Sequence, residues 1–241
     1  MEFCSVNKLL EKSFKSNWNH NALSNFNGLT LKYSELAKKI AELHVKFAGI
    51  GIEKGDKIAI CGRNQVNWAV SFLAAMTYGA VPVPLLHEFK PENIHYLVDH
   101  SDAVLLFVDE AILDNLSESE MPQLKSIVQL GNLDAFCDKT AFDERYPQGF
   151  YAGNVSYHED SPEELALINY TSGTSGFSKG VMLPYRSVYT NIVFAHETAE
   201  PQLDCNSSVV SMLPSAHMYG LMFEFLFQMS IWRSLIFFTE H

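Results

Sequence analysis

The sequence is poor in cysteine, with four residues in a chain of 241. These residues (Cys4, Cys61, Cys137 and Cys205) lie far apart and form no C-x-x-C pair, so neither a disulfide scaffold nor a cysteine zinc site is indicated. The histidines show no ligand spacing either, and we assign no metal-binding residue. We expect reduced thiols that serve as buried packing residues, as in a cytoplasmic protein.

The sequence also lacks long basic runs and an export signal. A net charge of −11 argues against a nucleic acid as partner, and the first thirty residues have no apolar core of the kind a signal peptide needs. The most apolar stretch, residues 70–86, is interrupted by Gly79, Pro82 and Pro84, which favours a helix followed by a strand over a membrane span. We therefore expect a cytoplasmic protein, free or peripheral to the membrane, with no integral membrane segment.

Hydrophobic residues make up 47% of the chain, enough for a sizeable core. Leu36, Ile40, Leu43 and Phe47 recur at helical spacing before Gly49 and Gly51, which predicts an amphipathic helix that ends there. Composition predicts further helices over residues 7–18, 65–78 and 91–99, and strands over residues 57–61, 81–85 and 103–108. This alternation is typical of parallel βαβ units, so the predicted fold class is α/β.

The second half begins with a long connection over residues 131–162, with one short hairpin as an alternative. An apolar strand over residues 165–170 then enters a glycine-rich loop, and residues 180–183 leave it as another extended piece. A helix over residues 184–195 and a strand over residues 208–212 follow.

The glycine-rich loop is locally cationic within an acidic protein. No acidic residue lies between positions 168 and 190, whereas Lys179 and Arg186 supply two positive charges. Gly173, Gly176 and Gly180 allow positive φ and a close approach of the backbone to a ligand. The hydroxyls of this loop add donors: Thr171, Ser172, Thr174, Ser175 and Ser178. The pattern predicts a phosphate site; the alternative is a flexible turn, which the strand-like flanks and Lys179 disfavour.

The spacing of the loop excludes three common motifs. Residues 170–181 contain no G-x-x-x-x-G-K-[ST] and no G-x-G-x-x-G, and residues 173–176 miss the G-x-S-x-G of a hydrolase elbow by one position. A kinase glycine loop is absent as well. The loop is therefore neither a Walker A motif, nor a Rossmann turn, nor a nucleophile elbow.

Residues 170–181, Tyr-Thr-Ser-Gly-Thr-Ser-Gly-Phe-Ser-Lys-Gly-Val, resemble the phosphate loop of the adenylate-forming (AMP-binding) enzymes, which include acyl-CoA synthetases. Ser175 stands where that family usually has Thr, and Ser178 where it usually has Pro. Residues 31–36, 51–60 and 76–84, with Asn64 and Trp68, resemble its N-terminal landmarks, and we assign them to packing.

The resemblance implies ATP-dependent activation of a carboxylic acid to an acyl-adenylate, followed by transfer to coenzyme A, with Mg²⁺ on the phosphates. It implies that Thr171 and Lys179 act in catalysis and that the nucleotide is held by Thr171, Ser172, Gly173, Thr174, Ser175, Gly176 and Lys179.

A second motif, residues 213–220, contains His217. In the family such a segment lies beside the carboxylate substrate, which implies that His217 orients the acid; the alternative is an ordinary histidine at the end of a strand. Met218, Tyr219, Met222 and Phe223 either line an acyl pocket or belong to the core.

The resemblance favours a medium- or long-chain fatty acid. Alternatives are an acyl-AMP ligase or amino-acid adenylation domain that loads a carrier protein, and an inactive nucleotide-binding or interaction module. Because family members run to about twice this length or more, we expect an incomplete N-terminal AMP-binding domain, inactive alone and without the C-terminal lid. Residues up to about 165 would form a first subdomain, and residues 166–241 the phosphate loop and the start of the acyl-binding region.

Overall fold

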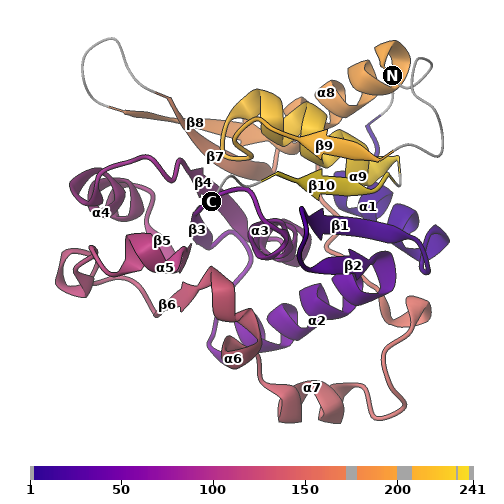
Figure 1. Ribbon diagram of the computed structural model, residues 1–241, viewed down its shortest axis with the longest axis horizontal. Helices are drawn as coiled ribbons and strands as arrows, with labels where there is room; N and C mark the ends of the chain where they lie inside the picture. The colour runs from indigo at the N-terminus through magenta and orange to yellow at the C-terminus, as the bar shows by residue number, and fades with distance from the viewer. Residues whose placement is uncertain (1–2, 172–177, 200–207, 232, 239–241) are drawn as a thin grey trace.

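A computed structural model describes residues 3–171, 178–199, 208–231 and 233–238 (Figure 1). The strands are β1 (Asn21–Asn25), β2 (Thr30–Lys32), β3 (Lys57–Cys61), β4 (Val81–Leu85), β5 (Ala103–Val108), β6 (Ser126–Gln129), β7 (Leu165–Thr171), β8 (Lys179–Pro184), β9 (Val209–Ser211) and β10 (Leu235–Phe237). The helices are α1 (Val6–Ser16), α2 (Tyr33–Gly49), α3 (Val66–Tyr78), α4 (Pro91–His100), α5 (Glu110–Leu113), α6 (Leu133–Phe136), α7 (Lys139–Arg145), α8 (Tyr185–Thr198) and α9 (Phe227–Ser230), with a π-helix over Gly220–Leu226. Short 3-10 turns cover Glu118–Glu120, Leu130–Asn132 and Ala152–Asn154.

One sheet is wholly parallel, with strand order β4-β3-β5-β6, and it is covered on both faces. Ile58 and Ile60 of β3 point into the large core that contains α2 and α3. Ala59 and Cys61 alternate with them and point to the other face, onto α4. A strand buried on both faces has no polar side, which explains the continuous apolar runs of β3 and β5.

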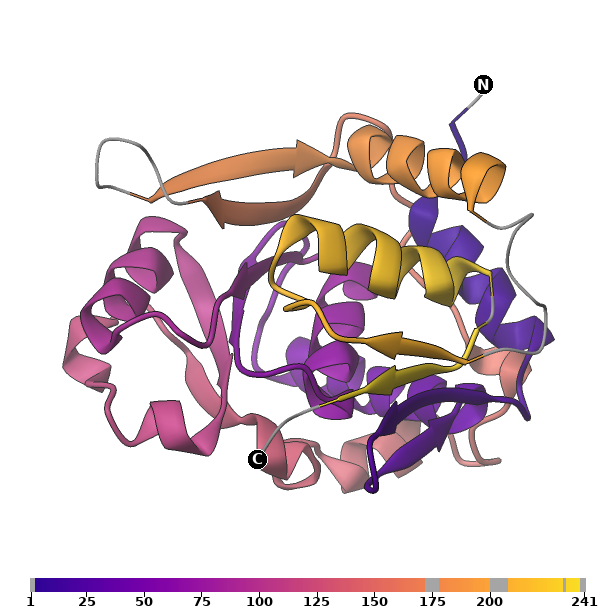
Figure 2. The same cartoon turned by 45° about the horizontal axis from the view of Figure 1, so that its top comes forward.

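A second sheet has the order β2-β1-β10-β9 and is mixed. Strand β1 pairs antiparallel with β2 and parallel with β10, which in turn pairs parallel with β9. This sheet therefore joins the beginning of the chain to its last described strand. Figure 2 shows the indigo strands of the N-terminus beside the yellow β10.

Strands β7 and β8 form an antiparallel pair of their own, and β7 runs beside β4 (Figure 1). The Val81 N–H donates to the Asp56 carbonyl at 2.8 Å, so the alternate positions Pro82 and Pro84 turn their nitrogens away from β3. Proline has no N–H to donate, which suits β4 as the edge strand of its sheet. Side chains rather than a backbone ladder therefore attach β7 to β4.

Most of the predicted elements are confirmed, and the α/β class with largely parallel sheets is correct. The alternative of a hairpin within residues 131–162 is wrong, because α6, α7 and 3-10 turns occupy that stretch. Strands β1, β6 and β10 were not predicted. The expectation that the cysteines are buried holds for Cys61 alone among the described thiols, because Cys4 is exposed and Cys137 half-buried; Cys205 lies outside the described residues.

The long connection is attached to the N-terminal helix by a buried carboxylate. Asp160, which is 5% exposed, accepts hydrogen bonds from the Ser5 hydroxyl at 2.6 Å and from the N–H groups of Val6 and Asn7 at 3.0 and 2.9 Å. These N–H groups belong to the first turn of α1 and have no partner within the helix. The negative charge of Asp160 at the amino end of α1 also interacts favourably with the helix dipole.

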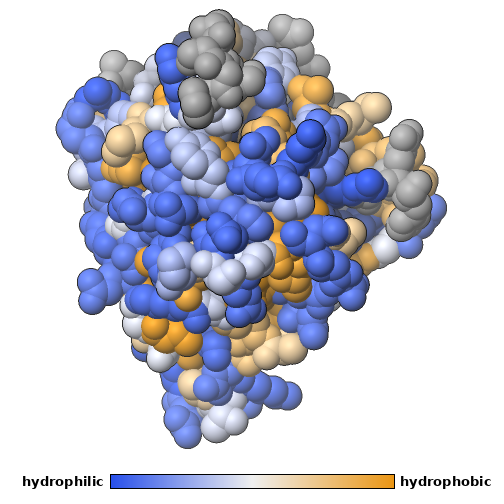
Figure 3. Space-filling view, turned by 90° about the vertical axis from the view of Figure 1, so that its left-hand side faces the viewer, coloured by the Kyte–Doolittle hydropathy of each residue, from blue (hydrophilic) through white to orange (hydrophobic). Residues whose placement is uncertain are grey.

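The described surface is mainly hydrophilic on the side of α4, with hydrophobic side chains in separate patches (Figure 3). Within the described ranges, no helix has both the length and the apolar character that crossing a membrane requires. The expected division near residue 165 stays a prediction.

Acid should destabilise this fold through His44. Burial lowers the pKa of His44 to about 4 from 6.5, although the Ala74 carbonyl, 3.1 Å from Nε2, opposes the change. Between these values the unfolded chain binds a proton that the folded chain does not, so the free energy of unfolding falls as pH is lowered through this window. We expect urea titrations of His44→Gln to show a weaker pH dependence than wild type, and the exposed His20→Gln to show an unchanged one. Equal slopes for His44→Gln and wild type would contradict the assignment.

Candidate active site

The β7–β8 pair places two predicted catalytic residues opposite each other. Thr171 is the last residue of β7 and Lys179 the first of β8, and the two are cross-strand partners in register. Directly opposite residues of an antiparallel pair project from the same face with their Cβ atoms about 5 Å apart. Ser172, Gly173, Thr174, Ser175 and Gly176 lie outside the described residues.

Lys179 is exposed and has no ion-pair partner among the residues that the structure describes. Arg186, by contrast, pairs with Glu163 at the start of α8. The prediction that both residues supply positive charge to the loop is therefore wrong for Arg186. The charge available to an anion at the base of this loop comes from Lys179.

The structure also corrects the role of Gly180. This residue lies within β8 and does not adopt positive φ, unlike Gly51 and Gly55 at φ 70° and 84°. A Cβ at position 180 would lie 3.1 Å from the ring of Tyr170, its cross-strand partner. The absence of a side chain at position 180 therefore makes room for the ring of Tyr170 rather than forming a turn.

Tyr170 anchors the end of β7 to helix α4. Its hydroxyl and His100 Nδ1 form a hydrogen bond of 2.7 Å, and its ring packs in the core beneath α4. Burial raises the pKa of Tyr170 to about 12, so the hydroxyl stays protonated at neutral pH. The hydrogen bond to His100 thus holds Tyr170, the residue before Thr171, against α4.

The segment that contains His217 follows β9 and precedes the π-helix. Glu224 of the π-helix folds back onto this segment and accepts hydrogen bonds from the Met212 and Leu213 N–H groups at 3.0 and 3.1 Å. A Cβ at Gly220 would lie 2.6 Å from the Pro214 carbonyl oxygen, so only glycine permits this close approach. The start of the π-helix therefore packs directly against the segment.

Two asparagines from distant parts of the chain hold the rest of the segment. Asn64, after β3, donates to the Leu213 carbonyl at 2.6 Å and accepts from the Ser215 N–H at 2.7 Å. Asn169 of β7 donates from Nδ2 to the Ala216 carbonyl at 3.0 Å. The segment is thereby attached to the parallel sheet and to β7.

His217 itself is exposed. Its backbone N–H donates to the Pro214 carbonyl at 2.8 Å, and its Nδ1 accepts a long hydrogen bond of 3.4 Å from the Tyr219 N–H. An accepting Nδ1 leaves the proton of the neutral ring on Nε2, which is then the donor available to a ligand. Tyr219 is 56% exposed and packs on Phe223 at 4.9 Å, whereas Met222 is buried core.

The sequence reasoning missed the positioning roles of Asn64, Asn169 and Glu224. Asn64 was assigned to packing, yet both ends of its amide bind the segment. Two signals were available: Asn64 follows the carboxyl end of a parallel strand, where ligand sites gather, and Asn169 is a polar residue inside an apolar strand.

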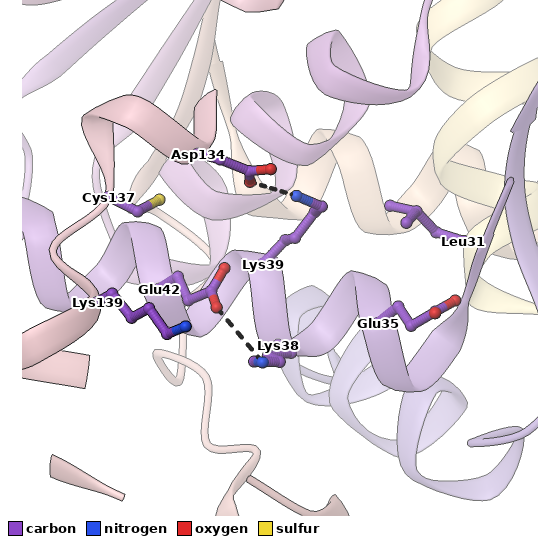
Figure 4. Close-up of a pocket in the computed structure, with 8 residues that line it drawn as sticks. All are labelled: Leu31, Glu35, Lys38, Lys39, Glu42, Asp134, Cys137 and Lys139. Atoms are coloured by element: carbon purple, nitrogen blue, oxygen red, sulfur yellow. Dashed lines mark hydrogen bonds and ion pairs between the residues drawn. The ribbon is translucent and has the colours of Figure 1, made fainter. Parts of the chain in front are cut away.

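Two hollows among the described residues lie away from this region. One, of about 360 Å³, is lined by α2 and α6 side chains including Lys39 and Asp134, which form an ion pair of 2.6 Å (Figure 4). Another, of about 1070 Å³, includes His44 and Tyr157. Neither includes Thr171, Lys179 or His217. Within the described ranges, no group of three or more His, Cys, Asp or Glu residues could hold a metal ion.

Comparisons with known proteins identify the family of this chain. A family model described as AMP-binding enzyme matches residues 10–239. Long-chain-fatty-acid–CoA ligase 6 of Rattus norvegicus is 27% identical over 216 residues, which cover 80% of this chain and 30% of the ligase. 4-Hydroxybutyrate–CoA ligase 2 of Metallosphaera sedula is 31% identical over 174 residues, or 69% of this chain and 31% of that enzyme. The chain thus spans about three-tenths of the length of these relatives.

Solved structures share the fold. VinN superposes with a TM-score of 0.81 at 22% identity, over 98% of this chain and 60% of VinN. ATP-bound MatB from Rhodopseudomonas palustris gives 0.77 at 20% identity, over 97% of this chain and 45% of MatB. Together with the family match over residues 10–239, this shows that the chain belongs to the AMP-binding enzyme family.

Proposed function

We propose that the native gene product activates a carboxylic acid with ATP and passes the acyl group to coenzyme A. The observation that carries this proposal is that Thr171 and Lys179 lie on the same face of the β7–β8 pair as Asn169. From this face, Asn169 binds the carbonyl of Ala216, the residue before His217. This placement supports a site in which a phosphate and a carboxylate would bind close to each other.

In the first half-reaction, a carboxylate oxygen attacks the α-phosphorus of ATP, and the bond from this phosphorus to pyrophosphate breaks. Lys179 would balance the charge of the β- and γ-phosphates and of the leaving pyrophosphate, with Thr171 as a hydroxyl donor. Residues 172–176 would add further donors. His217 would donate from Nε2 to the carboxylate and orient it for attack.

In the second half-reaction, the thiol of coenzyme A attacks the acyl carbon, the bond to AMP breaks, and the thiol proton is released. A carrier-protein thiol is the alternative acceptor. Mg²⁺ would bind the phosphate oxygens and neutralise their charge.

For the acid we propose a medium- or long-chain fatty acid. The names of the similar proteins include long-chain fatty acids and 4-hydroxybutyrate, so both classes must be tested. We further propose that the protein acts in the cytoplasm, free or peripheral to the membrane, and that its partners are small molecules rather than nucleic acids. A C-terminal lid domain outside residues 1–241 would complete the site. Residues 1–241 alone would then be inactive.

The first prediction concerns the reaction. The native gene product should catalyse ATP–pyrophosphate exchange that depends on a fatty acid, because formation of the adenylate is reversible. Exchange is measured with acetate, 4-hydroxybutyrate, octanoate and palmitate, and AMP release is then measured with and without coenzyme A.

Release of AMP that needs a carrier protein instead of coenzyme A would select the acyl-AMP ligase alternative. No exchange with any acid would overturn the proposal and favour an inactive nucleotide-binding module.

The second prediction concerns Lys179. Because a hydrogen bond to a charged group contributes about 1.5 to 3 kcal/mol, Lys179→Ala should lower kcat/KM for ATP in the exchange assay by about 10- to 150-fold. Lys12→Ala removes another exposed positive charge, on α1, and is the matched control. An unchanged ATP dependence in Lys179→Ala would remove this residue from the site.

The third prediction concerns His217. His217→Ala should raise KM for the acid or lower kcat, with KM for ATP changed by less than about threefold. His217→Gln, whose amide nitrogen can replace Nε2 as donor, should retain more activity than His217→Ala. Equal kinetics for both variants and wild type would show that His217 is an ordinary surface residue.

A further inference from the structure

Asn169 is a polar residue inside an otherwise apolar strand. It is 3% exposed, and its neighbours along β7 include Leu167 at 0% and Ile168 and Tyr170 at 7% each. A valine or isoleucine would suit such a strand, whereas a buried amide is stable only where it finds hydrogen-bond partners. The use of asparagine at this position therefore requires an explanation.

The partner of Asn169 lies 47 residues further along the chain. Its Nδ2 donates to the Ala216 carbonyl at 3.0 Å, and Ala216 immediately precedes His217. The His217 N–H in turn donates to the Pro214 carbonyl, which fixes the chain direction at this point. Asn169 therefore holds the backbone one residue before the proposed acid-orienting side chain.

The same side chain lies on the face of β7 that also carries Thr171. Side chains alternate along a strand, so Asn169 and Thr171 project from one face of β7, and Lys179 shares it as the register partner of Thr171. Ile168 and Tyr170 project from the other face, into the core beneath α4. One buried hydrogen bond thus connects the strand end that carries Thr171 with the segment that carries His217.

We propose that Asn169 is a positioning residue that sets the spacing between His217 and the strand ends that carry Thr171 and Lys179. This inference rests on the proposed function. ATP and the acid would each contact their own half of the site, and Asn169 would contact neither. Its hydrogen bond would determine whether the carboxylate oxygen and the α-phosphorus are aligned, and a displacement of about 1 Å can cost about 100-fold in rate.

The test compares Asn169→Ala with Asn67→Ala in the exchange assay of the native gene product. Asn67 is a matched control, because its Nδ2 also donates to a backbone carbonyl, that of Leu130 at 2.7 Å, on helix α3. Asn169→Ala should lower kcat by about 10- to 100-fold with both KM values within about threefold of wild type. Asn67→Ala should change kcat by less than about twofold, even if it lowers Tm by as much as Asn169→Ala does.

Asn169→Asp supplies an isosteric variant and a second readout, and it carries the test if Asn169→Ala fails to fold. An ionised carboxylate cannot donate to the Ala216 carbonyl, but a protonated carboxyl group can. Burial favours the protonated form, so the rate of Asn169→Asp relative to wild type should rise as pH is lowered from about 8 to about 6.

The inference would be overturned if kcat of Asn169→Ala were no lower than that of Asn67→Ala, or if the relative rate of Asn169→Asp did not depend on pH. Exchange by the wild-type protein would still uphold the proposed function in that case. Absence of exchange in the wild-type protein would overturn both.

Discussion

Residues 212–216 run between β9 and the π-helix without a regular hydrogen-bond ladder, so side chains must satisfy their backbone polar groups. Asn64, Asn169 and Glu224 do so from three different elements. The position of His217 therefore depends on the parallel sheet, the β7–β8 pair and the π-helix at once. This is the reason why a small exposed region requires so large a core.

The two sheets make this arrangement possible. The parallel sheet ends its strands at one edge, where Asn64 follows β3, and it is covered by helices on both faces. The mixed sheet brings β9 into line with β1 through β10, so the start of the chain supports the segment that begins after β9. Asn64, Asn169 and Glu224 are distant in sequence and belong to different parts of the fold, yet all three contact the segment before His217.

Much of the fold could be predicted because apolar periodicity reports burial directly, as in α2 and β3. Strands β1 and β10 could not, since they are short and gain stability from pairing with each other. The loop motif predicted Thr171 and Lys179, which pair across β7 and β8, and their part in a binding site stays a prediction. Arg186 was counted among the charges of the same window, but it pairs with Glu163, which lies outside the motif. Asn64 and Asn169 could not be recognised as partners of one segment, because their meeting is a property of the topology rather than of local sequence.

Pro82 and Pro84 leave the outer edge of β4 without donors, and β7 lies beside it. A strand attached only through side chains can slide along its neighbour without breaking backbone hydrogen bonds. The position of β7 beside β4 then depends on how Ile168 and Tyr170 pack in the core beneath α4. The hydrophobic packing under α4 therefore supports the strand end that carries Thr171, and a change in core volume there would shift this strand end.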